Sequence, residues 1–475
     1  MSNVITTTPQ LASYLDAFSA FNKRAPGHTQ PWLRSLREDA FSRFAEVGFP
    51  TTHDEDWRFT SVAAIANTAF QLPAAGKAKV SAHELEPYRF TASACQLVFV
   101  NGRYAPELSV LGVLPKGVKV GSLAEQITNN ASAIEPHLGR YLNTQRDAFC
   151  ALNTAFIEDG AYLHIARGAV LENPIYLLFV SVGSDTPLMT HPRNLIIAEE
   201  NSQAAIIEDY ISLGSGEPAF SNTATELVAG DDSVVSHYML EREHAQAFNI
   251  STLRIQQGRS TSVASHSVLL GGRLVRNNVH PVLAGEGADC LINGLFIGNG
   301  RQHMDNYMLV EHASPHCGSR QFYNGILDGH SRGVFHGRII VHKDAQKTDA
   351  KQTNRNLLLS DNAQIDTKPQ LEIYADDVKC THGATIGQIE ENALFYLRSR
   401  GMDEGSARRL LLYAFASECL DRMKPEALRA HLEQLITGWL FGEGGFASEI
   451  TAAHALEAAS GQPTQRKPGN WEEVG

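Results

Sequence analysis

The 475-residue sequence lacks the features of several common protein classes. Its six cysteines are scattered along the chain without a C-x-x-C pair, which excludes a disulfide framework and predicts reduced, mostly buried thiols. The longest apolar run, around Ile175 to Val182, is too short to span a bilayer. The N-terminus has no basic start followed by an apolar run, so no secretory signal is expected. We therefore expect a soluble, cytoplasmic protein with no membrane partner.

Positive charge is also in short supply. The chain has 40 Lys and Arg against 52 Asp and Glu, a formal net charge of −12, and no basic cluster of the kind that nucleic-acid binding requires. A P-loop, a G-x-S-x-G nucleophile motif and an H-E-x-x-H zinc motif are all missing. These absences argue against nucleic acid as a partner and against ATP turnover by this chain, so we expect a protein that is not an enzyme.

The hydrophobic pattern divides the chain into three parts. Residues 1–150 predict helices with a short β segment near an Asn101-Gly102 turn, residues 151–386 predict short strands, and residues 387–475 predict helices followed by a polar tail from Ser460. In the middle part, polar turns recur at gaps of 31, 27, 27 and 27 residues, at Ser202, Ser233, Ser260, Gly287 and Ser314.

Regular turns without intervening helices favour a β-solenoid, in which each coil adds a strand to each sheet. A sandwich of hairpins is the alternative, but it would need more two-residue turns such as Asp328-Gly329. We predict a mainly β fold with a β-helix core at 151–386 between two helical domains. The helices would cap the solenoid or dock a partner.

The main candidate for chemistry is the predicted strand from Val378 to Ile386. Strand alternation places Cys380 and His382 on the same apolar face. A thiolate and an imidazole suit iron, zinc or an iron–sulfur cluster, although a buried pair of this kind also fits ordinary core packing. Two ligands do not complete a four-coordinate site, so another chain must supply the rest or the metal must bind weakly. A histidine-rich stretch from Glu311 to Cys317 fits polar side chains on one rung better than a metal path.

Two stretches resemble a known family. Cys380-Thr-His-Gly-Ala-Thr-Ile-Gly387, followed by Leu394-Phe-Tyr-Leu-Arg-Ser-Arg-Gly401, is similar to the SufD family of the SUF iron–sulfur cluster assembly system. His53-Asp-Glu-Asp-Trp-Arg-Phe-Thr60 resembles the acidic-Trp-basic-aromatic stretch of the same family. The sister subunit SufB usually has Glu-Ala-Thr in place of Gly383-Ala384-Thr385, which favours the SufD branch.

The resemblance implies a right-handed parallel β-helix that pairs with a SufB-like subunit, or with a second copy as a homodimer. It also implies that a SufC-like ATPase docks on the C-terminal helices. Residues expected to contact that ATPase are Tyr396, Arg398, Leu410, Leu411, Tyr413 and Phe415. By resemblance, His382 and Cys380 would help to hold a transient iron–sulfur cluster or iron at a shared interface, with no tightly bound cofactor.

The leading hypothesis is therefore a non-catalytic scaffold subunit of a SufBCD-type complex. Two alternatives stay open. One is a β-helix carbohydrate lyase or hydrolase, which would need paired acids or calcium-binding carboxylates in a groove. The other is a purely structural solenoid that binds proteins, for which His382 would have no role in cluster formation.

Overall fold

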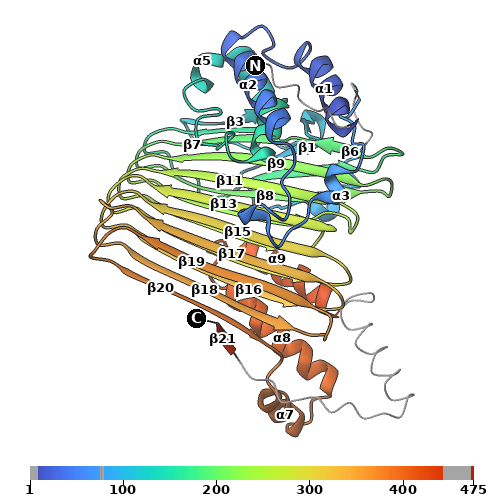
Figure 1. The fold of residues 1–475 in the computed structure, drawn as a ribbon, viewed down its shortest axis with the longest axis vertical. Helices are drawn as coiled ribbons and strands as arrows, with labels where there is room; N and C mark the ends of the chain where they lie inside the picture. Colours follow the sequence, from blue (N-terminus) through green and yellow to red (C-terminus); the bar gives the residue numbers. More distant parts are fainter. Residues whose placement is uncertain (1–8, 75, 77–79, 442–471, 475) are drawn as a thin grey trace.

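The computed structural model describes residues 9–74, 76, 80–441 and 472–474. Figure 1 shows a stack of long strands with the N-terminal helices gathered at one end and the C-terminal helices toward the other. The predicted polar tail from Ser460 lies largely outside the described residues. No helix among the described residues is long and apolar enough to cross a membrane.

The described helices occupy the two ends of the chain. The α-helices are α1 (Pro9–Asn22), α2 (Pro31–Val47), α3 (Ala63–Ala66), α4 (Leu123–Asn129), α5 (Ala131–Ile134), α6 (Ala148–Ala155), α7 (Glu391–Ser399), α8 (Glu404–Leu420) and α9 (Glu426–Phe441). Three short 3-10 helices are η1 (Glu55–Trp57), η2 (Glu86–Tyr88) and η3 (Pro106–Leu108). Helix α8 begins where predicted, because the Asp403 side chain accepts a hydrogen bond from the Ser406 amide.

The strands form two sheets. The first is 11-stranded and runs β2 (Arg103–Tyr104), β1 (Cys95–Val100), β5 (Ile175–Val182), β8 (Gln203–Leu213), β10 (Val234–Arg242), β12 (Ser262–Leu269), β14 (Asp289–Gly298), β16 (Gly318–Leu327), β18 (Asp349–Leu358), β20 (Lys379–Gly387), β21 (Glu472–Val474). The second is 10-stranded and runs β19 (Gln364–Ile373), β17 (Arg332–Val341), β15 (His303–His312), β13 (Leu274–Leu283), β11 (Phe248–Gln257), β9 (Ala219–Ala229), β7 (Arg193–Ala198), β4 (Ala161–Ile165), β3 (Val118–Ser122), with β6 (Leu188–Thr190) beside β9.

The order of the strands confirms the predicted β-solenoid. From β5 to β20 consecutive strands alternate between the sheets, and neighbours within each sheet are parallel, apart from the short β6, which joins the second sheet beside β9. The alternative prediction, a sandwich of hairpins, is wrong, since antiparallel pairs among the described strands are confined to β1–β2, β3–β4 and β20–β21. Side chains pointing inward from both sheets form the main apolar core.

Residues in the left-handed backbone region explain the recurring turns. Corners between successive strands carry Asn201 (φ 58°), Asp232 (φ 58°), Ser260 (φ 53°), Gly287 (φ 72°) and His316 (φ 59°). Gly tolerates this conformation best, Asn, Asp and His are enriched in it, and Ser adopts it at a cost. Corners of this kind recur from Asn201 to Lys347 at nearly constant spacing, which is the signal in the sequence.

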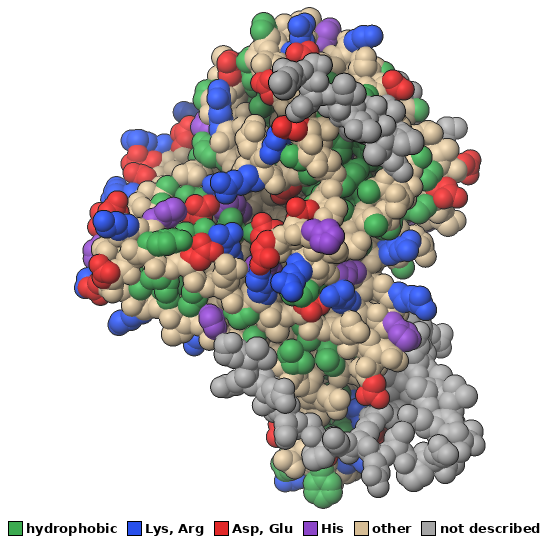
Figure 2. Space-filling model, viewed as in Figure 1, with side chains coloured by type: hydrophobic (Ala, Val, Ile, Leu, Met, Phe, Trp, Pro, Cys, Tyr) green, Lys and Arg blue, Asp and Glu red, His purple; other side chains and the backbone are tan. Residues whose placement is uncertain are grey.

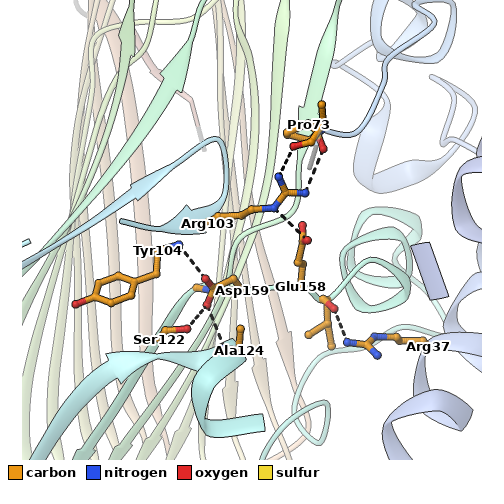
Figure 3. Close-up of polar contacts among 11 residues, drawn as sticks. Arg37, Pro73, Arg103, Tyr104, Ser122, Ala124, Glu158 and Asp159 are labelled. Carbon is orange, nitrogen blue, oxygen red and sulfur yellow. Dashed lines mark hydrogen bonds and ion pairs between the residues drawn. The ribbon is translucent and has the colours of Figure 1, made fainter. Parts of the chain in front are cut away.

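The N-terminal part is built into the solenoid. Strand β1 pairs in parallel with β5, and α6 crosses the predicted boundary between residues 150 and 151. Figure 3 shows the polar contacts at this junction. The buried carboxylate of Asp159 accepts hydrogen bonds from the Tyr104 amide (2.8 Å) and the Ser122 hydroxyl (2.7 Å). Arg37 Nη2 donates to the Ile157 carbonyl at 2.6 Å. The first coil and the N-terminal helices are therefore joined through buried groups.

Helices cover the outer faces of the sheets. The second sheet packs against the N-terminal helices through an aromatic cluster that includes Phe220 and Phe248. The first sheet packs against α8 and α9. Asn293 Nδ2 donates to the Cys419 carbonyl (2.9 Å), and Asn324 Nδ2 donates to the Phe415 carbonyl (2.8 Å), which fixes α8 across β14 and β16. On the face in Figure 2, acidic, basic and histidine side chains are mixed across the remaining surface of the solenoid.

Candidate functional site

The last coil of the solenoid is open among the described residues. Strand β19 pairs only with β17, and β20 pairs with β18 and, at Ala384 to Ile386, with β21. The outer edge of β19 and of residues 379–383 thus has no strand partner in the described part of the chain. Unpaired edges of this kind present free N–H and C=O groups to another chain.

Burial changes sharply at this end. Strand β16 is mostly buried, whereas no residue of β19 and only Ala384 of β20 are buried. Inward-facing side chains of the last coil therefore lack the layer of atoms that the next coil would supply. This half-exposed layer is where the structure places the predicted site.

Cys380 stands at the end of an inward-facing column of the first sheet. The parallel register aligns Cys290, Ser319, Ala350 and Cys380 on successive strands. Cys290 is fully buried, whereas Cys380 is half-buried. The other five of the six cysteines are all buried. Burial nevertheless raises the pKa of the Cys380 thiol, so the thiol keeps its proton at neutral pH.

His382 ends the neighbouring column. Its aligned neighbours on the two preceding strands are Gln352 and Gln321. The imidazole is half-buried, and its Nδ1 atom is buried without a hydrogen-bond partner in the described structure. The Cys380 and His382 side chains point the same way from one strand, two strand rises of about 3.3 Å apart. They are therefore close enough to bind the same small cluster.

No group of three or more His, Cys, Asp or Glu side chains that would hold a metal ion occurs among the described residues. Cys380 and His382 are two candidate ligands, and a cluster held by them would need further ligands from elsewhere. In the histidine-rich stretch, His312 is buried against the Ser319 hydroxyl and His316 occupies a turn. Those two residues do not meet on one rung.

The sequence did not predict that two histidines on the outer face of the second sheet contact one glutamate. On the second sheet, Glu311 accepts from His280 at 2.5 Å and lies 3.3 Å from His342. These contacts hold the pKa of Glu311 at about 2. The three residues come from different coils, so only the register between coils brings them together.

The predicted ATPase contacts on the C-terminal helices differ in exposure. Tyr396 and Leu410 are 57% and 41% exposed, Arg398 is exposed, and Leu411 and Tyr413 are half-buried. Phe415 is the exception, since it is buried against the solenoid in the same apolar cluster as Leu412. The helix turns that side chain toward its own sheet, so the contact of Phe415 with an ATPase stays a prediction that its burial disfavours. Phe395, which is 74% exposed on α7, was not among the contacts predicted from the sequence.

Comparisons with known proteins agree with this architecture. Residues 9–177 match the SufBD protein N-terminal region, and residues 179–415 match the SufBD core domain of SUF system FeS cluster assembly. An iron–sulfur cluster assembly SufBD family protein of Synechocystis sp. is 36% identical over 85% of this chain and 90% of its own length. The iron–sulfur cluster assembly protein SufD of Escherichia coli is 32% identical over 86% of this chain and 91% of its own. The chain therefore belongs to the SufBD family of iron–sulfur cluster assembly proteins.

Proposed function

We propose that this chain is a non-catalytic scaffold subunit on which an iron–sulfur cluster is assembled at the open end of the solenoid. The observation that carries the proposal is the placement of Cys380 and His382 on the inner face of the last strand, half-buried and incomplete as a ligand set. In this account the cluster is cargo: it forms there and then leaves.

The partner at this end is a homologous SufB-like solenoid. The edges of β19 and residues 379–383 support pairing with strands of another chain, and a second solenoid offers edges of the same kind. Such pairing would cover Cys380 and His382 and supply the missing ligands. A second copy of this chain fits the edge in the same way, as a homodimer.

A SufC-like ATPase would supply the energy, because this sequence has no P-loop. Its docking surface is the exposed side of α7 and α8, which carries Phe395, Tyr396, Arg398 and Leu410. Aromatic residues and Arg are enriched at protein interfaces, and an apolar side chain such as Phe395 gains by being covered. The Asn293 and Asn324 contacts tie α8 to the first sheet, so docking there can act on the solenoid.

The test is anaerobic cluster assembly on the complete complex. Tagged protein should co-purify with a homologous solenoid and an ATPase, and the complex should gain cluster absorbance with iron and a sulfide source. His382→Ala should keep partner binding, since the side chain is half-buried at an edge, but lower the cluster yield several-fold. His342→Ala, on the outer surface, is the matched control. Full cluster yield with His382→Ala would contradict the proposal.

A further inference from the structure

Behind His382 lie polar atoms that have no partner among the described residues. Gln321, Gln352 and His382 occupy one inward-facing column on successive strands. Gln321 Nε2, Gln352 Oε1 and His382 Nδ1 are all buried, and each lacks a hydrogen bond in the described structure. A buried polar group left unpaired destabilises the fold, so such a group needs a partner or a bound water.

The position of the Gln352 amide is fixed on two sides. Its Nε2 atom donates to Gln321 Oε1 at 2.8 Å. On the facing sheet, a Cβ atom added to Gly337 would lie 1.6 Å from Gln352 Nε2, so the amide occupies space that the glycine leaves open. With the nitrogen turned to Gln321, the oxygen of the planar amide stays free as an acceptor.

Ordinary packing does not demand this polar column. Two strands before Gln352 the same column holds Ile292, which is fully buried, so an apolar side chain fits this part of the interior. Gln321 and Gln352 are also almost fully buried, at 2% and 1% exposed, and burying an amide is costly unless it is hydrogen-bonded. Within this column, the two amides lie on β16 and β18, the strands that directly precede His382 in the sheet.

Gln352 Oε1 and His382 Nδ1 are the two unpaired atoms next to the site, and one is an acceptor that suits a protonated nitrogen at the other. A neutral imidazole donates from one ring nitrogen and offers a lone pair on the other, and the hydrogen bond at one nitrogen decides which is which. His382 Nδ1 faces the interior, while Nε2 is neither hydrogen-bonded nor among the buried unpaired atoms of the described structure. Nε2 is thus the nitrogen turned toward the open end.

We propose that Gln352 is a positioning residue for His382. Its Oε1 accepts the Nδ1–H of His382 through one buried water, and so keeps Nε2 unprotonated toward the interface as a ligand for iron. Gln321 holds the amide, and Gly337 makes the space for it. This inference rests on the proposed function of His382.

The test determines which nitrogen of His382 carries the proton. Full-length protein labelled with ¹⁵N-histidine is examined by two-bond ¹H–¹⁵N NMR, with His382→Gln identifying the signal. The wild type should show the Nδ1–H form. Gln352→Leu should lose this preference, Gln352→Glu should keep it because a carboxylate oxygen still accepts, and His342 should stay unchanged. If His382 of the wild type carries its proton on Nε2, the inference is overturned. It is also overturned if the tautomer of His382 is the same in Gln352→Leu as in the wild type.

A second measurement separates this inference from the proposed function. Anaerobic binding of Fe²⁺ alone to the assembled complex should weaken about 10-fold or more in Gln352→Leu, the loss typical of removing an outer partner of a metal-bound histidine. If His382→Ala lowers cluster yield while Gln352→Leu binds Fe²⁺ like the wild type, the positioning role fails and the scaffold function stands. If His382→Ala has no effect on yield, the scaffold function fails first.

Discussion

The buried ion pair between Arg193 and Glu226 gives the sharpest stability prediction. Both side chains are fully buried, with Arg193 Nη2 2.6 Å from Glu226 Oε1. The carboxylate also accepts from the amides of Gly139 (2.7 Å) and Tyr141 (3.0 Å), and Arg193 Nη1 donates to Asn153 Oδ1 (2.9 Å). This network joins β7 and β9 to the N-terminal helical segment, so its loss should loosen the start of the solenoid.

Glu226→Gln keeps the size of the side chain but leaves Arg193 as an uncompensated buried charge. Removing one partner of such a pair costs about 3–5 kcal/mol. For a chain of 475 residues the entropy of unfolding is about 1 kcal/mol/K, so the melting temperature should fall by about 3–5 °C if the solenoid unfolds as one unit.

Differential scanning calorimetry and urea unfolding measure this change. The matched control is Glu200→Gln, which removes the exposed pair with Arg167, where the side chains are 38% and 71% exposed. That change should cost less than about 1 kcal/mol. A loss below about 1 kcal/mol for Glu226→Gln would refute the reasoning that the buried charges depend on each other.

Three further predictions concern acid stability, helix attachment and metal binding. The pKa of Glu311 is held near 2 mainly by its hydrogen bond from His280, so its stabilisation is complete above its ordinary pKa of 4.5 and is lost as pH falls toward 2. As the pH is lowered, the melting temperature of Glu311→Gln should therefore fall less steeply than that of the wild type. An equal slope of melting temperature against pH in the two proteins would contradict this. Asn324→Ala should cost about 1–2 kcal/mol and speed amide hydrogen exchange in α8, because the bond to the Phe415 carbonyl is lost; unchanged exchange there would oppose it. Fe²⁺ binding to the assembled complex should strengthen from pH about 7 to about 9, because Cys380 must lose its proton, and a similar slope in Cys380→Ser would count against the thiol as a ligand.

The solenoid could be predicted from the sequence because its corners leave a local signal. The corners from Asn201 to Lys347 hold residues in the left-handed region, such as Asp232 or Gly287, and these residues repeat with the length of a coil. The face of β20 that carries Cys380 and His382 followed from strand alternation alone. Both features depend on near neighbours in the chain.

Other features depend on contacts between coils or between helix and sheet. The meeting of His280 with Glu311 requires the register of β13 against β15, which no local pattern specifies. The burial of Phe415 against the sheet was not predicted, because α8 carries apolar residues around much of its circumference, so its sequence does not show which of them faces the sheet. The alignment of Gln352 with His382 was not predicted either, because it depends on the register of β18 against β20.

Thiol accessibility tests the central claim most directly. Native alkylation followed by mass spectrometry reports each cysteine separately. In the isolated chain, Cys380 should be modified well before the other five cysteines, all of which are buried. After the SufB-like partner binds, Cys380 should become protected while the rate at an unfolding-dependent site such as Cys290 stays the same. Equal modification of Cys380 with and without the partner would contradict the claim that another chain covers this end of the solenoid.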